Sequence, residues 1–110
     1  MEKVKDAEVI VFATPIYYYE MAGQMKTLLD RLNPLFSSDY SFRDVYMIAT
    51  AAENEDSAFE KACSGLQGWV DCFEKAELMG IVTGGGISAP NEAGKHRNTM
   101  LKAYELGKRL

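Results

Sequence analysis

The chain has 110 residues, an apolar fraction of 47% and a formal net charge of −4 at pH 7, values that suit a single globular domain. Its 12 basic against 16 acidic residues argue against a nucleic-acid-binding protein, which normally concentrates lysine and arginine on one face. No apolar stretch approaches the roughly 18 residues that a membrane-spanning helix needs, so we expect no membrane association. A charged N-terminus without an apolar signal region predicts a cytoplasmic protein.

The first apolar run is Val9–Ala13, and a stretch with helical periodicity follows it. Apolar residues recur at positions 21, 25, 28, 29 and 32, which is the spacing of one helix face. Asn33-Pro34 ends this helix, because a proline disfavours helical geometry in the residue before it. Lys26 and Asp30 lie one turn apart on the helix and are expected to form a surface ion pair.

The second apolar run, Val45–Ala49, precedes a second helix. This helix is predicted to begin at Asp56 or Ser57, because Ser57 and Glu60 have the spacing of a capping box. The apolar stripe of the helix continues as far as Phe73, with a tryptophan beside it. A buried face is therefore expected along its whole length.

A third apolar run, Leu78–Thr83, and a last helix over about residues 94–110 complete the order β-α-β-α-β-α. All three runs are nearly continuous rather than alternating, which is typical of strands buried on both faces of a parallel sheet. The connections are long enough for right-handed crossovers. We therefore predict an α/β fold, a doubly wound parallel sheet made of three βα units.

Three strands are few for this architecture. Doubly wound domains of the flavodoxin type use five strands in the order 2-1-3-4-5, so the sequence looks like the C-terminal three-fifths of a larger domain. The strand Val9–Ala13 would then present an apolar edge, which invites pairing with another chain. We expect a homodimer formed through this edge, or its cover by swapped elements.

Ligands of open α/β sheets bind beyond the carboxyl ends of the strands, and this selects three loops. The first, Thr14–Glu20, holds three consecutive tyrosines after Pro15, whose ring makes the turn rigid. Tyrosines present flat faces that suit a planar heterocycle, although one or two of them could instead plug the core. In the second, Thr50–Glu55, small residues let backbone amides reach a ligand, or form a turn before a helix cap. The third, Gly84–Asn91, is expected to be a flexible turn or a lid.

Metal and disulfide chemistry find little support in the sequence. The single histidine, His96, is expected to be exposed, and no CxxC pattern is present, so no metal site is predicted. Cys63 and Cys72 are nine residues apart on one predicted helix, which places them on opposite faces where they cannot bridge. Two free thiols are typical of a reducing compartment.

The stretch TPIYYYEMAGQMKTLLDR, residues 14–31, resembles the signature of the NADPH-dependent FMN reductase family, which are flavodoxin-like flavoproteins. Ten spaced positions agree with the family pattern: Thr14, Pro15, Tyr17, Ala22, Met25, Lys26, Leu28, Leu29, Asp30 and Arg31. The preceding DAEVIVFA looks like the strand that the family places before this signature. The later elements fit in order and spacing, so the resemblance covers essentially the whole chain.

The resemblance implies FMN as cofactor and NAD(P)H as reductant, with hydride passing through the flavin to a small-molecule electron acceptor. In the family, the loop after the third strand lies along the isoalloxazine and ribityl part of FMN, and the loop after the fourth contacts the ring. Carried over by position, the cofactor-binding residues are Thr14, Pro15, Ile16, Tyr17, Tyr18, Tyr19, Thr50, Ala51, Ala52 and Glu53. The resemblance implies no catalytic acid–base residue, because the flavin does the chemistry.

The family holds the FMN phosphate in a loop after strand one, and the sequence begins near what resembles strand three. We therefore expect residues 1–110 to form a truncated flavodoxin-like domain with weakened FMN binding. Each missing charge-assisted hydrogen bond would remove about 1.5–3 kcal/mol. The alternative is a cofactor-free flavodoxin-like fragment that acts as an interaction module or has no activity.

Overall fold

The computed structural model describes residues 1–110 and confirms three parallel strands with intervening helices. The strands are β1 (Val9–Tyr17), β3 (Asp44–Thr50) and β4 (Glu77–Gly84), and the two-residue strand β2 (Glu20–Met21) pairs antiparallel with the end of β1. The order in the sheet is β2-β1-β3-β4, and both β1–β3 and β3–β4 are parallel pairs. The predicted α/β architecture is therefore correct.

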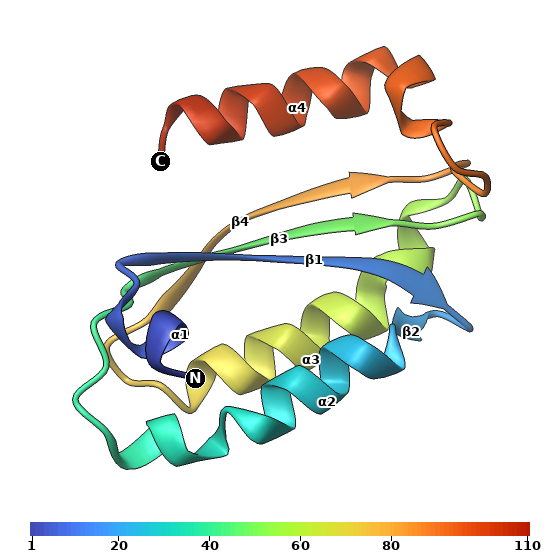
Figure 1. Cartoon of the computed structure of the whole chain (residues 1–110). Helices are drawn as coiled ribbons and strands as arrows, with labels where there is room; N and C mark the ends of the chain where they lie inside the picture. The colour runs from blue at the N-terminus through green and yellow to red at the C-terminus, as the bar shows by residue number, and fades with distance from the viewer.

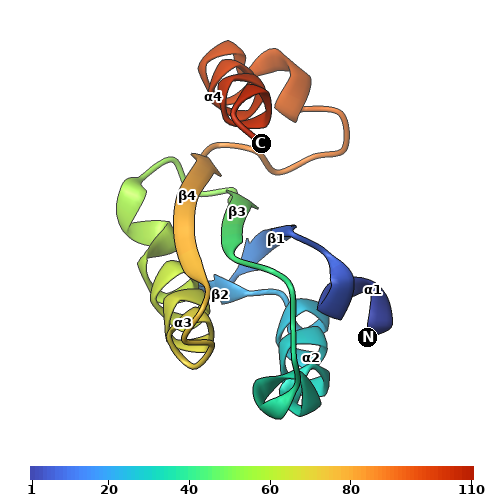
Figure 2. The same cartoon turned by 90° about the vertical axis from the view of Figure 1, so that its left-hand side faces the viewer.

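The helices cover the two faces of the sheet unequally. They are α1 (Glu2–Asp6), α2 (Gly23–Arg31), α3 (Glu60–Asp71) and α4 (Arg97–Lys108), with short 3₁₀ segments at Asn33–Ser37, Asp56–Phe59 and Ala93–Lys95. Figures 1 and 2 show α2 and α3 on one face of the sheet and α4 alone on the other. No helix is both long enough and apolar enough to cross a membrane.

The main core lies between the sheet and the layer formed by α2 and α3. Phe12 of β1 and Met47 of β3 are buried in it, and an aromatic cluster closes one end. In this cluster the Trp69 and Phe73 rings lie 4.4 Å apart, measured between centroids. The Trp69 indole N–H also donates to the Leu29 carbonyl at 3.2 Å, which ties α3 to α2.

The second face of the sheet carries a much smaller core, formed by Tyr46, Val82 and Leu106. Because α4 packs over β4, it leaves the same face of β1 open, and Val11 remains 40% exposed. Three large apolar side chains of α4 are exposed as well: Met100, Leu101 and Tyr104. The prediction of burial on both faces therefore holds for β3 and is wrong for β1 and for β4, in which Met79 and Ile81 are 51% and 40% exposed.

The outer edge of β1 is largely unpaired. Strand β2 meets it only at Ile16 and Tyr17, and β3 occupies the other edge from Val9 to Pro15. The predicted apolar edge is thus present over Val9–Ala13. Its pairing with a second copy of the chain stays a prediction.

Several helix boundaries differ from those expected. Met21 belongs to the β1–β2 hairpin, so α2 begins at Gly23. The capping box at Ser57 does not form, because Asp56–Phe59 is a 3₁₀ segment and no side chain caps it. The last helix begins only at Arg97, after the 3₁₀ segment Ala93–Lys95.

Two side-chain expectations can also be compared with the structure. Lys26 Nζ and Asp30 Oδ1 form the predicted surface ion pair at 2.8 Å. Cys63 is half-buried in α3, whereas Cys72 lies just beyond the end of this helix and is exposed. Both cysteines are free.

Candidate functional site

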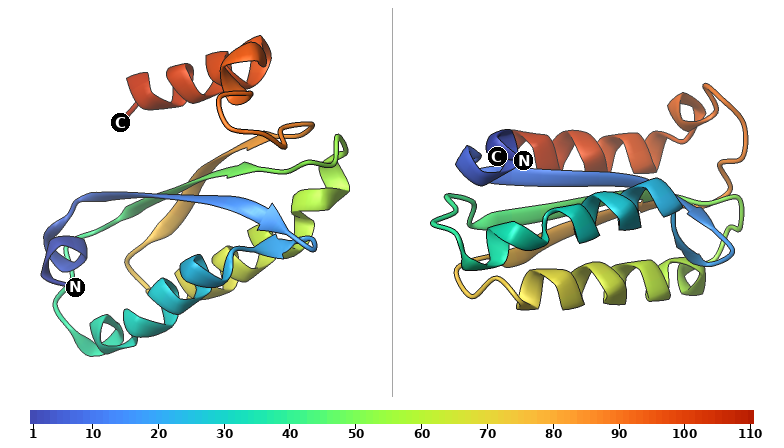
Figure 3. Two further views of the ribbon diagram at one scale, coloured as in Figure 1. Left: turned by 45° about the vertical axis from the view of Figure 1, so that its right-hand side comes forward. Right: turned by 60° about the horizontal axis from the view of Figure 1, so that its bottom comes forward.

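The segments that follow β1, β3 and β4 lie at one end of the sheet, as Figures 1 and 3 show. The parallel register places Pro15 opposite Thr50 and Thr50 opposite Gly84. The two segments that resemble flavin-binding loops are therefore neighbours. This end of the sheet is where open α/β sheets bind their ligands.

The first of these segments is a hairpin rather than the loop expected over Thr14–Glu20. Strand β1 continues through Pro15 to Tyr17, and only Tyr18 and Tyr19 form the turn. Proline is compatible with this extension, because its fixed φ suits extended backbone and its missing N–H is tolerated near a sheet edge. The connection is therefore a paired extension of the strand as far as Tyr17, and its rigidity stays a prediction.

The turn itself holds its two tyrosines in the left-handed region, with φ of 51° at Tyr18 and 65° at Tyr19. A two-residue hairpin with positive φ at both positions normally carries Asn-Gly or a similar pair. A side chain in this region costs about 1–2 kcal/mol per residue. The surroundings hold the conformation through β1–β2 pairing and through the Ala22 N–H, which donates to Thr14 Oγ1 at 3.0 Å.

The tyrosines and the residues before them have different environments. Tyr17, Tyr18 and Tyr19 are 59%, 98% and 42% exposed, so none of them plugs the core. Thr14 and Ile16 are buried on the face of β1 that packs against the main core. The hairpin thus presents tyrosine rings at its tip and anchors itself with the alternate residues of the strand.

In the second segment, Thr50–Glu53, some backbone groups are hydrogen-bonded within the chain and others are open. The Ala51 N–H donates to the Gly84 carbonyl at 2.9 Å, and the Ala51 carbonyl accepts from the Ile87 N–H at 2.8 Å. Both backbone groups of Ala51 are therefore occupied within the chain. The N–H groups of Ala52 and Glu53 have no acceptor in the chain, so two donors remain open beside the hairpin.

The glycine-rich segment after β4 is hydrogen-bonded to the second segment at Gly86 and Ile87, and the flexibility expected over Gly84–Asn91 stays a prediction. The Gly86 N–H donates to the Glu53 carbonyl at 3.2 Å, and φ at Gly86 is 71°. A Cβ added at Gly85 would lie 2.9 Å from the Glu53 carbonyl oxygen, closer than real Cβ contacts. Gly85 is therefore required by the close approach of the two backbones, and Gly86 is favoured by its left-handed φ.

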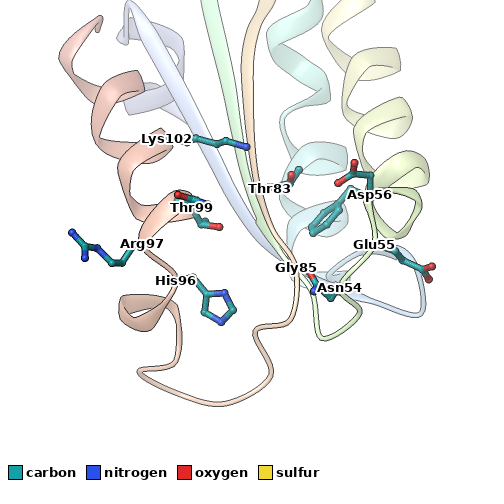
Figure 4. A pocket seen from close by; sticks show the side chains of 11 residues that line it. Asn54, Glu55, Asp56, Thr83, Gly85, His96, Arg97, Thr99 and Lys102 are labelled. Carbon is teal, nitrogen blue, oxygen red and sulfur yellow. The ribbon is translucent and has the colours of Figure 1, made fainter.

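A polar cavity of about 330 Å³ lies between the segment after β3 and the start of α4, and it was not predicted from the sequence. Asp56 lines one side, Lys102 and a half-buried His96 line the other, and Gly85 contributes its backbone (Figure 4). These residues come from three separated segments, so no spacing in the sequence could have found them together. The expectation that His96 is exposed is wrong.

The pKa values of two groups move away from their ordinary range. Burial raises the pKa of the Cys63 thiol. The Ser88 and Ala89 N–H groups donate to the Glu92 carboxylate at 3.2 and 2.9 Å and lower the pKa of Glu92. Neither Cys63 nor Glu92 lies at the tyrosine hairpin.

Comparison with known proteins agrees with the resemblance seen in the sequence. The model of a family described as NADPH-dependent FMN reductase matches residues 1–101. YwqN of Bacillus subtilis, named as an NAD(P)H-dependent FMN-containing oxidoreductase, is 31% identical over 62 residues, which are 49% of this chain and 34% of that protein. An iron-sulfur flavoprotein of Archaeoglobus fulgidus is 44% identical over 41 residues, 37% of this chain and 21% of that protein.

Among solved structures, the Trp repressor binding protein from Bacillus subtilis superimposes with a TM-score of 0.72 at 24% identity. The superposition covers 90% of this chain and 63% of that one, and it shows a shared flavodoxin-like α/β fold. The matches thus span less than two thirds of each relative's own length.

Proposed function

Because the chain belongs to the NADPH-dependent FMN reductase family, we propose that it carries the flavin-ring side of an NAD(P)H-dependent FMN oxidoreductase site. The observation that carries the proposal is the meeting of three exposed tyrosines and two open backbone donors at the carboxyl end of the sheet. FMN, when bound, would take up hydride from NAD(P)H and deliver it to a small-molecule acceptor, while the protein supplies position and electrostatics.

The tyrosine hairpin suits a flat heterocycle. Tyr17, Tyr18 and Tyr19 offer amphipathic rings outside the core, and an aromatic pair contributes about 0.5–1.5 kcal/mol beyond the burial of its area. Two of these residues are kept in a left-handed conformation, and backbone strain of this kind tends to persist at ligand-binding sites. We assign the stacking surface to these three side chains.

The second segment suits the polar edge of the same ring. The open N–H groups of Ala52 and Glu53 can donate to ring carbonyl or nitrogen acceptors, which orients the ring without any titratable group. Thr50 lies opposite Pro15 in the register and joins the two segments. Ala51, whose backbone is fully occupied, would position this segment rather than touch the flavin.

Thr14 and Ile16 would likewise act by positioning. Both are buried, and the Thr14 hydroxyl is engaged within the chain, where it accepts from the Ala22 N–H and donates to the Pro15 carbonyl. None of the contacts assigned to either segment involves a phosphate group. We therefore expect riboflavin and FMN to bind this chain with similar affinity.

The test is a titration of the purified chain with riboflavin and with FMN, followed by quenching of flavin fluorescence and by visible absorbance. Replacing Tyr17 by alanine should weaken binding about 2- to 10-fold, and Tyr17→Phe should retain most of it, since the ring does the stacking. Tyr104→Ala is the matched control, because Tyr104 is an exposed tyrosine on α4.

Two outcomes would contradict the proposal. One is a chain that takes up neither flavin, which would favour the cofactor-free fragment instead. The other is equal flavin affinity in Tyr17→Ala and in the control variant, which would place any binding elsewhere on the chain.

A further inference from the structure

The polar cavity beside α4 has two walls of opposite chemical character. Its volume is about 330 Å³, at the small end of the range for ligand pockets. Six of the side chains that line it matter here: Asn54, Asp56, Thr83, His96, Thr99 and Lys102. Two acidic residues of the lining, Glu55 and Asp56, come from the segment after β3, and the basic groups come from the start of α4.

The charges on the two walls face each other without pairing. In Figure 4, Lys102 and Asp56 extend from opposite sides toward Thr83. No ion pair joins them, since the ion pairs of the structure are Lys26–Asp30 and Lys75–Asp39. A cation and an anion held apart across a cavity present donors on one side and acceptors on the other.

On the basic wall, His96 lies against the glycine segment. A Cβ added at Gly86 would lie 3.7 Å from His96 Cε1, so the imidazole packs directly against this backbone. The same glycine donates to the Glu53 carbonyl, which links the His96 wall to the segment that carries Asn54. The buried ring of Phe59 adds the one apolar side chain to the lining.

We propose that this cavity binds a ribose phosphate. Phosphate oxygens only accept hydrogen bonds, and the Lys102 ammonium, the Thr99 hydroxyl and an imidazole N–H of His96 can all donate to them. Ribose hydroxyls donate to a carboxylate such as Asp56, and the Asn54 amide can serve as donor or acceptor. The size of the cavity suits one such group and not an entire dinucleotide.

The identity of the carrier rests on the proposed function, in which NAD(P)H is the reductant. The cavity shares the segment after β3 with the candidate flavin site: Glu53 has an open donor there, and Asn54 lines the cavity. We assign to this cavity the 2′-phosphorylated ribose of NADPH, a group that NADH lacks. The chain would accordingly prefer NADPH.

The test uses calorimetric titration of the full chain with adenosine 2′,5′-bisphosphate and, separately, with adenosine. The bisphosphate should bind at least ten-fold more tightly than adenosine. Lys102→Met should remove about ten-fold or more of that affinity, the size expected for one hydrogen bond from a charged donor, and Lys102→Arg should restore part of it. Lys108→Met, on the same helix outside the cavity, is the matched control.

Equal affinity for the bisphosphate and adenosine, or unchanged affinity in Lys102→Met, would overturn the assignment. The same variants are titrated with riboflavin in parallel, and their flavin binding should equal that of the wild type. Flavin binding without bisphosphate binding therefore refutes this inference alone. Bisphosphate binding without flavin binding refutes the proposed flavin site alone.

Discussion

Replacing Gly85 by alanine tests how the end of the sheet is held together. The new Cβ would lie 2.9 Å from the Glu53 carbonyl oxygen and 3.1 Å from Asn54 Cα. Both atoms belong to the backbone, so a rotamer change cannot relieve the contact. The segment after β4 must then move away from the segment after β3.

The cost follows from what this movement disrupts. Two hydrogen bonds span the contact, from the Gly86 N–H to the Glu53 carbonyl and from the Ile87 N–H to the Ala51 carbonyl. Each contributes about 0.5–1.5 kcal/mol net, so their loss lowers the free energy of unfolding by about 1–3 kcal/mol. For a domain of this size, that corresponds to a decrease in Tm of about 4–12 °C.

Urea unfolding followed by circular dichroism measures this change. The dependence of the free energy of unfolding on urea concentration should equal that of the wild type, because the surface exposed on unfolding is unaltered. Gly94→Ala is the matched control, since an added Cβ there meets nothing within 4 Å. Its free energy of unfolding should stay within about 0.5 kcal/mol of the wild type. A Gly85→Ala variant as stable as this control would refute the close approach of the two segments.

Three further predictions concern single residues. Tyr18→Gly should raise the free energy of unfolding by about 1 kcal/mol in a thermal melt, because the 98% exposed side chain adds left-handed strain with little packing. The same variant should bind flavin more weakly, since it lacks one of the stacking rings. A less stable variant would show that the Tyr18 ring makes contacts in the folded chain. Burial raises the pKa of Cys63 in the folded chain above its unfolded value, so less of its thiolate is present at pH 8. Iodoacetamide should therefore modify the exposed Cys72 faster than Cys63, and the difference should vanish in denaturant. Equal modification rates in the folded chain would contradict this. A second copy covering the edge of β1 should appear as a dimer in light scattering, and Val11→Lys should shift it toward monomer; a wild-type monomer at micromolar concentration would rule the pairing out.

The sequence predicted strands well where each strand's own pattern decides its environment. Strand β3 reads as a continuous apolar run, and both Tyr46 and Met47 are buried, one on each face. Strand β1 has the same kind of pattern, yet Val11 is exposed. Cover for a sheet face comes from other elements, and the apolar pattern of one strand does not reveal whether they are present.

The candidate site was predicted only in part, because part of it depends on contacts between distant segments of the chain. The tyrosines were located correctly at the carboxyl end of β1, but Tyr18 and Tyr19 carry no turn signal of the Asn-Gly kind, so the hairpin was missed. The polar cavity depends on Asp56 and Lys102, which are far apart in the chain and line one cavity only because the segment after β4 brings α4 back against the sheet. Local patterns cannot predict such a meeting.

The short segment Ala51–Asn54 contributes to both candidate sites. Ala51 and Glu53 are hydrogen-bonded to the glycine segment that packs against His96, and the N–H groups of Ala52 and Glu53 have no acceptor in the chain. A ligand that draws this segment toward the hairpin would also change the distance between the walls of the cavity. Binding at the two sites would then be linked by one coupling free energy, and each ligand would change the other's affinity by the same factor.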